Sequence, residues 1–129
     1  MRRLMVAATA LGFFAAVAPA MAVDAVKADP AHYKIEVDNA QVRVLRAHFG
    51  PHEKSVMHSH PDTIAVFLTD GHVKFTAPDG KTQEANVKAG ETQWRPAETH
   101  LPENLGDTPF DVIVVELKHK APPPAHKMK

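Results

Sequence analysis

Short runs in which hydrophobic and polar side chains alternate dominate the chain from residue 33 onward. Alternation with a period of two, in segments rich in β-branched and aromatic residues, indicates strands with one buried face. Helical periodicity is absent from this region, and only residues 25–32 are compatible with a turn of helix. We interpret nine segments as strands or short extended pieces: 33–37, 41–49, 54–60, 63–68, 72–76, 81–85, 92–95, 99–104 and 110–117.

Turn-forming residues separate these segments at close intervals. Proline, glycine, aspartate and asparagine make up the breaks, among them Asp38-Asn39, Gly50-Pro51, Pro61-Asp62, Asp70-Gly71 and Pro78-Asp79-Gly80. Such short connections leave little room for helical crossovers between parallel strands. The chain is therefore predicted to be all-β, with an antiparallel sandwich or barrel as its architecture.

Three hydrophobic features carry more specific expectations. The last run, 110–117, is apolar enough to predict a strand buried on both faces. Phe67 and Trp94 are most simply core residues. If either lined a cavity instead, it would favour flat or apolar ligands.

The first 22 residues have the pattern of an export signal peptide. Arg2 and Arg3 supply a positive start, residues 4–18 form an apolar stretch, and Ala20-Met21-Ala22 gives the small-x-small cleavage pattern. The apolar stretch is shorter than the ~20 residues of a membrane-spanning helix, and a retained N-terminal anchor is the alternative. Cleavage after Ala22 predicts a periplasmic or secreted protein without stable membrane insertion.

The remaining 129 − 22 = 107 residues allow one domain, which we place at 23–117. Residues 118–129 contain three consecutive prolines among lysines and histidines, which predicts a disordered tail. The absence of cysteine excludes disulfides, thiolate metal sites and cysteine nucleophiles. Loss of the two leader arginines leaves a net charge of 13 − 15 = −2, and no basic face indicates a nucleic-acid partner.

His58 and His60 are the residues most informative about chemistry. Side chains two positions apart on a strand leave the same face, with Cα atoms roughly 6.5–7 Å apart. Two imidazoles at that separation can bind one divalent ion at about 2.0–2.1 Å per Zn–N bond. His100 is the candidate third ligand, and three histidines would leave coordination positions open for solvent or substrate. Histidines that are hydrogen-bonded or exposed, without a metal, are the alternative.

Two spaced patterns resemble the motifs of the cupin superfamily of small jelly-roll β-barrels. The first motif is matched, with two extra residues after its glycine, by Gly50, His58, His60 and Gly71. The second motif is matched, with one residue fewer before its histidine, by Gly90, Pro96, His100 and Asn104. The resemblance covers about residues 42–117 and implies a jelly-roll barrel with His58, His60 and His100 as metal ligands.

The resemblance also implies a glutamate ligand four or five residues after His60, where this chain has Ile64 and Ala65. We assign the missing acid to Ile64, so Ile64→Glu should tighten metal binding if residue 64 faces the ion. Three neutral imidazoles leave an ion its full +2 charge, which predicts weaker metal binding and an anionic co-ligand. Glu98 is a surface residue, a partner that orients an imidazole, or a carboxylate ligand supplied from another strand.

The other polar candidates have less specific interpretations. Asp62 follows Pro61 directly and is assigned to a turn. His48 and His72 are interpreted as exposed strand residues, and His119 and His126 belong to the predicted tail.

Two functions from different classes remain open on the sequence alone. One is an exported, metal-dependent oxygenase or isomerase that acts on a small oxygenated molecule. The other is a non-catalytic protein of the cell envelope that binds a metal or a small molecule. The ion could be Fe, Mn, Ni, Cu or Zn, and no catalytic acid or base stands out. Resemblance to cupins further implies a homodimer formed through edge strands.

Overall fold

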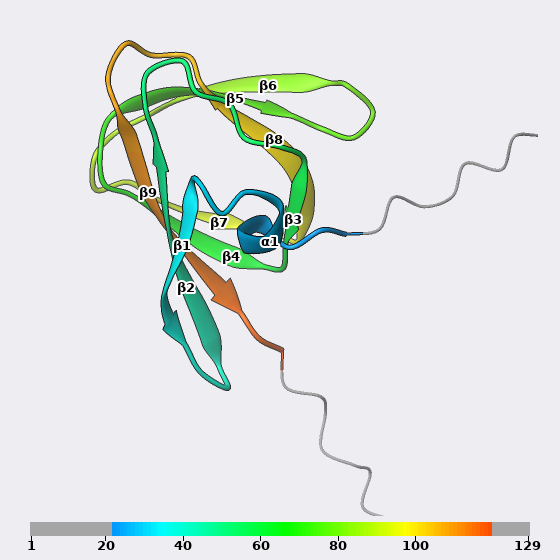
Figure 1. Ribbon diagram of the computed structural model, residues 1–129. Coiled ribbons are helices and arrows are strands. Elements are labelled where there is room, and N and C mark those ends of the chain that lie inside the picture. The colour runs from blue at the N-terminus through cyan, green and yellow to red at the C-terminus, as the bar shows by residue number, and fades with distance from the viewer. Residues whose placement is uncertain (1–21, 120–129) are drawn as a thin grey trace, which may run out of the picture.

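The computed structural model describes residues 22–119, which form nine strands and one short helix. The strands wind around a common interior (Figure 1). No helix within the described residues is long and apolar enough to cross a membrane. The predicted signal peptide, apart from Ala22, and residues 120–129 of the predicted tail lie outside this range. The elements are α1 (Ala25–Ala28), β1 (Tyr33–Asp38), β2 (Val42–Phe49), β3 (His58–His60), β4 (Thr63–Phe67), β5 (Gly71–Thr76), β6 (Thr82–Val87), β7 (Thr92–Arg95), β8 (Glu98–Asn104) and β9 (Phe110–Leu117).

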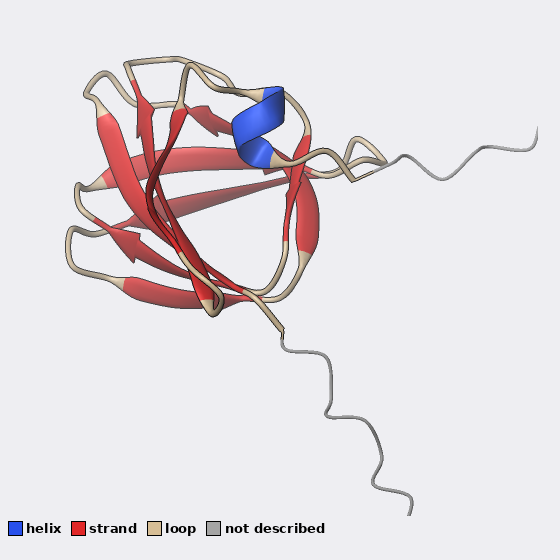
Figure 2. Cartoon of the chain, turned by 60° about the horizontal axis from the view of Figure 1, so that its bottom comes forward, coloured by secondary structure: helices blue, strands red, loops and turns tan. Residues whose placement is uncertain are grey.

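Two antiparallel sheets enclose the interior. One has five strands in the order β1-β2-β9-β4-β7, and the other has four in the order β3-β8-β5-β6. Figure 2 shows the strands curving around the interior, with the helix α1 beside them. The predicted all-β jelly-roll architecture is confirmed, although the two sheets do not close into one continuous barrel.

Two glycines are required by the backbone around them. Gly80 lies in the predicted hairpin turn between β5 and β6 and has a φ of 85°, a conformation that glycine adopts without strain. Gly71 opens β5 against the ring of Phe110, where an added Cβ would lie 2.4 Å from Phe110 Cδ2. The turn at residue 80 and the close packing at residue 71 therefore both depend on the absence of a side chain.

Alternation along the strands directs one set of side chains into the core. On β9, the inward positions 110, 112, 114 and 116 are buried, and the positions between them are only partly buried. The prediction that this strand is buried on both faces is therefore wrong, because β9 covers the core with one face only. Phe67 on β4 is buried in the core, as predicted.

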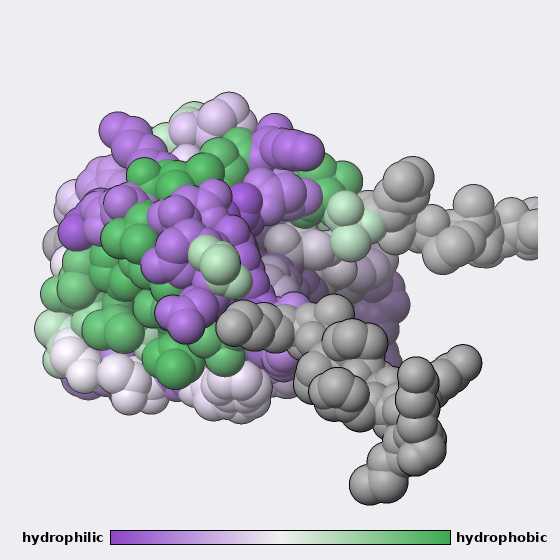
Figure 3. All heavy atoms as spheres, turned by 90° about the horizontal axis from the view of Figure 1, so that it is seen from below, coloured by the Kyte–Doolittle hydropathy of each residue, from purple (hydrophilic) through white to green (hydrophobic). Residues whose placement is uncertain are grey.

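Trp94 lies on the outside of the five-stranded sheet and is 59% exposed, so its assignment to the core is wrong. It stands opposite Ile64 on the neighbouring strand, and the pairing register continues the row through Val115 and Val44 to Val37. These five residues form one apolar row across all five strands, which we call the outer row. Figure 3 shows hydrophobic side chains gathered on the face seen from below.

Candidate metal centre

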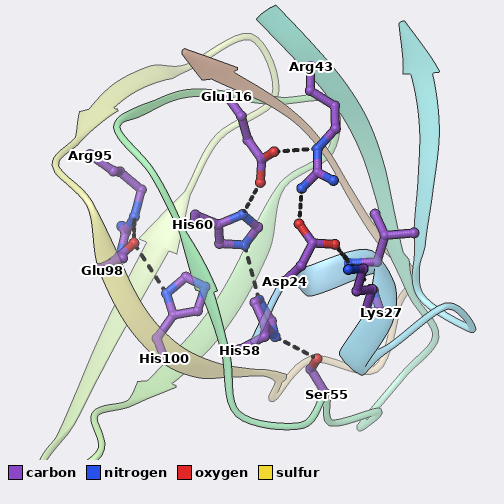
Figure 4. Close-up of polar contacts among 11 residues, drawn as sticks. Asp24, Lys27, Arg43, Ser55, His58, His60, Arg95, Glu98, His100 and Glu116 are labelled. Carbon is purple, nitrogen blue, oxygen red and sulfur yellow. Dashed lines mark hydrogen bonds and ion pairs between the residues drawn. The ribbon is translucent and has the colours of Figure 1, made fainter. Parts of the chain in front are cut away.

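Three histidines from two paired strands meet inside the molecule. The antiparallel register of β3 and β8 places His58 opposite His100, and His60 opposite Glu98. Because residues two apart share a face of a strand, all four side chains leave the same side of this pair. All three imidazoles are buried, and one nitrogen from each lies within 4.8 Å of the others. The convergence of His58, His60 and His100 predicted from the sequence is therefore present in the fold (Figure 4).

Hydrogen bonds fix which nitrogen of His58 and of His60 carries a proton. His58 Nδ1 lies 2.8 Å from the carbonyl oxygen of Val56, and His60 Nδ1 lies 2.8 Å from Oε1 of Glu116. Both acceptors lack a hydrogen of their own, so each Nδ1 is the donor. In the neutral form, the Nε2 atom of each ring therefore bears a lone pair.

These two Nε2 atoms point at each other across 3.0 Å. Two lone pairs at that separation repel each other, unless a proton or a cation lies between them. Two nitrogen ligands bound at about 2.1 Å and at right angles on one ion also lie roughly 3.0 Å apart. The donor set therefore fits a divalent transition-metal ion, because the imidazoles are held apart at a distance that suits a shared cation.

His100 completes the set and lacks a hydrogen-bond partner. Neither of its buried ring nitrogens has one among the described residues. Its Nδ1 lies 3.2 Å from Oε1 of Glu98, close enough for an electrostatic contact but not aligned as a hydrogen bond. The ring of Phe75 stacks on the imidazole at 5.4 Å between centroids. A buried imidazole with an unsatisfied nitrogen beside two lone-pair donors has the chemistry of a third metal ligand.

Burial lowers the pKa of two histidines of this cluster, His58 and His100. Burial, together with the neighbouring His60 and His100, lowers the pKa of His58 to about 4. Burial also lowers the pKa of His100, although the adjacent Glu98 carboxylate opposes that shift. Neutral imidazoles are the protonation state that binds metal, so these two ligands are prepared for an ion at neutral pH.

Glu116 is a functional residue that the sequence interpretation missed. Its carboxylate is buried, accepts a hydrogen bond from His60 and accepts another from Arg43 Nε at 2.6 Å. Although burial opposes it, this pairing holds the pKa of Glu116 below its usual value. A signal was available: strict alternation along 110–117 places residue 116 on the same face as Phe110, so an acid there had to be buried and paired.

The short helix α1 is tied to both histidines of β3. Asp24 caps its N-terminus by accepting from the backbone of Val26, and also forms an ion pair with Arg43, the partner of Glu116. At the other end, Asp29 accepts a hydrogen bond from Ser55 Oγ at 2.5 Å, and that oxygen lies 3.4 Å from His58 Nδ1. The N-terminal segment therefore supports the centre through two chains of polar contacts.

Glu98 is the second carboxylate at the centre. Its two oxygens accept from Arg95 Nε at 2.5 Å and from Arg95 Nη2 at 3.0 Å. Burial raises its pKa, but the interactions with His100 and Arg95 prevail and hold the pKa at about 2. Of the three roles expected for Glu98, the described contacts match that of a partner to an imidazole.

The position of the missing acid is corrected by the structure. Ile64 belongs to the outer row and is 38% exposed, so it points away from the histidines and its assignment was wrong. Ala65 is the inward residue of β4, is 4% exposed, and lines the same cavity as His60 and His100. The chain therefore has alanine where a carboxylate from β4 would reach the centre.

The remaining histidines lie apart from the centre. His48 and His72 are exposed and pair with Asp111 and Glu84, as expected for surface strand residues. Asp62 accepts a hydrogen bond from the backbone of Ala97, which agrees with its assignment to a turn. His119 is exposed, and His126 lies outside the described residues.

A narrow cavity runs from the centre into the core. The space in it that the centres of water molecules can occupy is about 50 Å³. Its polar lining residues are Tyr33, His60, Thr63, Arg95, Glu98 and His100. The rest is apolar, with Phe49, Ala65, Phe67, Val73, Phe75, Pro102, Phe110, Val112 and Val114. Such a cavity accommodates an apolar group next to a polar or metal-bound one.

Two facing antiparallel sheets with a buried histidine cluster between them define a small β-protein with a candidate metal centre. Comparison with protein families identifies its class further: the cupin domain matches residues 45–116. The chain belongs to the cupin family. A search of curated proteins found no match.

Solved structures support the fold. A cupin domain from Bordetella pertussis Tohama I is 27% identical, with a TM-score of 0.63, over 67% of this chain and 92% of that one. An RmlC-like cupin with a double-stranded β-helix fold from Methanocaldococcus jannaschii is 17% identical, with a TM-score of 0.55, over 67% and 79% of the two chains. A protein from Bacillus halodurans is 18% identical, with a TM-score of 0.56, over 71% and 74%.

Proposed function

We propose that this cupin binds one divalent transition-metal ion through the Nε2 atoms of His58 and His60 together with His100. The observation that carries the proposal is the pair of Nε2 atoms 3.0 Å apart, whose rings both donate from Nδ1 to fixed acceptors. The ion itself would act as a Lewis acid toward an oxygen atom of a bound molecule. The protein supplies the orientation of the rings and a cavity that is mostly apolar.

The bound molecule is a small anion with an apolar part. The two carboxylates that contact histidines of the centre are each paired with an arginine, Glu116 with Arg43 and Glu98 with Arg95. These pairs contribute little net charge, so the +2 charge of an ion would attract an anionic ligand. The apolar lining of the cavity favours a hydrocarbon portion beside the charged group.

Binding, without catalysis, is the role we favour. The one carboxylate that both borders the cavity and adjoins a histidine is Glu98, and its pKa of about 2 makes it a weak base. The cavity thus lacks, among its described lining residues, a side chain matched to proton transfer near neutral pH other than the ligands themselves. An oxygenase activity would have to depend on the ion alone, and it is the second candidate.

Export to the periplasm or the medium is part of the proposal. The described fold makes its first contact at Val23, whose carbonyl accepts from Ser59 N at 2.7 Å. Cleavage after Ala22 would therefore leave every described contact of the domain intact. N-terminal sequencing of protein recovered outside the cytoplasm should begin at Val23, and an unprocessed chain found only inside the cell would contradict export.

Metal analysis tests the centre directly. After incubation with Mn, Fe, Ni, Cu or Zn and removal of loose ions, the protein should retain close to one ion per chain. The triple variant His58→Ala, His60→Ala, His100→Ala should retain none. A matched variant that removes the exposed His48 and His72 should keep the ion. An empty wild-type protein, or equal retention by the triple variant, would refute the centre.

A further inference from the structure

The cavity at the metal centre shares one wall with a groove on the surface. The space in the groove that the centres of water molecules can occupy is about 300 Å³. Residues that border both spaces are Phe75, Arg95, Glu98 and His100. The rest of the groove is formed by Ala77, Lys81, Thr82, Gln83 and Thr99. A molecule that enters the cavity from this groove would therefore pass Arg95 and Glu98.

Arg95 is held in place from two directions. Glu98 accepts from the edge of the guanidinium formed by Nε and Nη2. Arg95 Cζ also lies over the ring of Phe75, 4.6 Å from the ring centroid, in a cation–π contact. Phe75 in turn stacks on His100, so the guanidinium is fixed relative to the metal centre. Figure 4 shows Arg95, Glu98 and His100 in sequence at this side of the site.

One edge of the same guanidinium remains available to a ligand. Arginine has five N–H donors, and Glu98 engages only Nε and one N–H of Nη2. Within residues 22–119, no other group accepts a hydrogen bond from Arg95. The second edge, formed by Nη1 and the other N–H of Nη2, has the geometry that binds both oxygens of a carboxylate.

The chemistry around this edge indicates the class of ligand. Among the described residues, Arg95 is the only cationic side chain that lines the cavity, and most of the other lining side chains are hydrocarbon. We propose that Arg95 selects a small carboxylic acid with an apolar body, whose carboxylate binds the open guanidinium edge and whose apolar part enters the cavity. This inference rests on the proposed anionic ligand and names the residue that recognises it.

Benzoate and its uncharged isostere benzamide are suitable probes, because both are planar with the same apolar ring. Calorimetric or NMR titration of the full protein should show that benzoate binds at least about 10-fold more tightly than benzamide, since charged hydrogen bonds are involved. Arg95→Gln should weaken benzoate binding roughly 10- to 100-fold and change benzamide binding little. Arg95→Lys should recover only part of the loss, because lysine cannot form the two-pronged contact.

Lys74 provides the matched control, since it pairs with Glu103 at 2.8 Å and borders neither space. Lys74→Gln should leave the affinity for benzoate unchanged. Arg95→Gln leaves Glu98 without its partner, so the double variant Arg95→Gln, Glu98→Gln guards against loss of folding. It should show the same weak binding of benzoate. Equal loss in the Lys74 variant, or no loss in either Arg95 variant, would overturn the inference.

Titrations of both the metal-loaded and the metal-free protein separate this inference from the metal centre. The effect of Arg95→Gln should appear in both forms, because the guanidinium edge does not depend on an ion. A protein that takes up no metal but discriminates benzoate through Arg95 would refute the centre and support this inference. A protein that takes up one metal ion but whose affinity for benzoate is independent of Arg95 would support the metal centre and refute this inference.

Discussion

Replacement of Glu116 by glutamine should uncouple the centre from the support behind it. The glutamate side chain is 3% exposed and joins Arg43 to His60. Glutamine still offers an oxygen to His60, but it cannot keep the charge that stabilises Arg43. Its amide group also places a donor opposite the donor Arg43 Nε.

The magnitude follows from burial and from the partner that remains. Loss of one member of a buried ion pair typically costs 3–5 kcal/mol. Arg43 keeps its ion pair with Asp24, so we expect the lower end, about 3 kcal/mol. In a domain near 100 residues, this loss corresponds to a fall in Tm of roughly 10 °C or more. Metal affinity should fall about 10- to 100-fold, because the partner that orients His60 is weakened.

Glu84→Gln makes the same chemical change at an exposed pair and is the matched control. Glu84 lies 2.8 Å from His72, and their side chains are 57% and 42% exposed. Its loss should change the free energy of unfolding by less than about 0.5 kcal/mol. Urea denaturation of the metal-free variants and chelator competition of the loaded ones measure both effects. Equal stability and metal affinity in the two variants would refute the reasoning.

The register, the protonation and the outer face of the fold give three further predictions. Ala65→Glu should tighten metal binding and Ile64→Glu should not, as measured by chelator competition. Tighter binding by the Ile64→Glu variant alone would show that residue 64, and not residue 65, faces the ion. Because the pKa of His58 falls from 6.5 to about 4 on folding, the unfolded chain takes up its proton first. The metal-free protein should therefore lose roughly 3 kcal/mol of stability as the pH falls from 6.5 to 4, and a flat urea midpoint over that window would contradict this. If the expected homodimer uses the outer row, Trp94→Lys should give monomers in sedimentation, and Val56→Lys, a control at an exposed hydrophobic residue outside that row, should not. A wild-type monomer at all concentrations excludes the dimer.

Local patterns located the strands well but not always the side that faces inward. Each of the nine expected runs overlaps a strand of the described residues, and the hairpin turn at Gly80 is where the residue types place it. Trp94 was assigned to the core because of its hydrophobicity alone. Alternation shows which residues share a face, whereas packing of the whole sheet decides which face is buried. On β7 that choice turned Arg95 toward the cavity and Trp94 outward.

The same limit applies to the acid expected four or five residues after His60. Spacing allowed either Ile64 or Ala65, and one residue of difference reverses the side of a strand. Glu116 was overlooked for a related reason, because the run 110–117 was interpreted from its overall hydrophobicity and not position by position. Strict alternation with Phe110 would have placed it inward, although it could not have named Arg43 as its partner.

The sequence by itself determined the all-β class, the strand positions and the pairing of His58 with His60, because all three depend on neighbours a few residues apart. The family resemblance already named His100, but only the tertiary structure decided which charged side chains surround the three histidines. The register of β3 against β8 brings His100 and Glu98 to that pair, and Arg43 meets Glu116 across 73 residues of chain. Such contacts depend on how distant strands pair and which faces they bury together, and no local period of side chains encodes that choice.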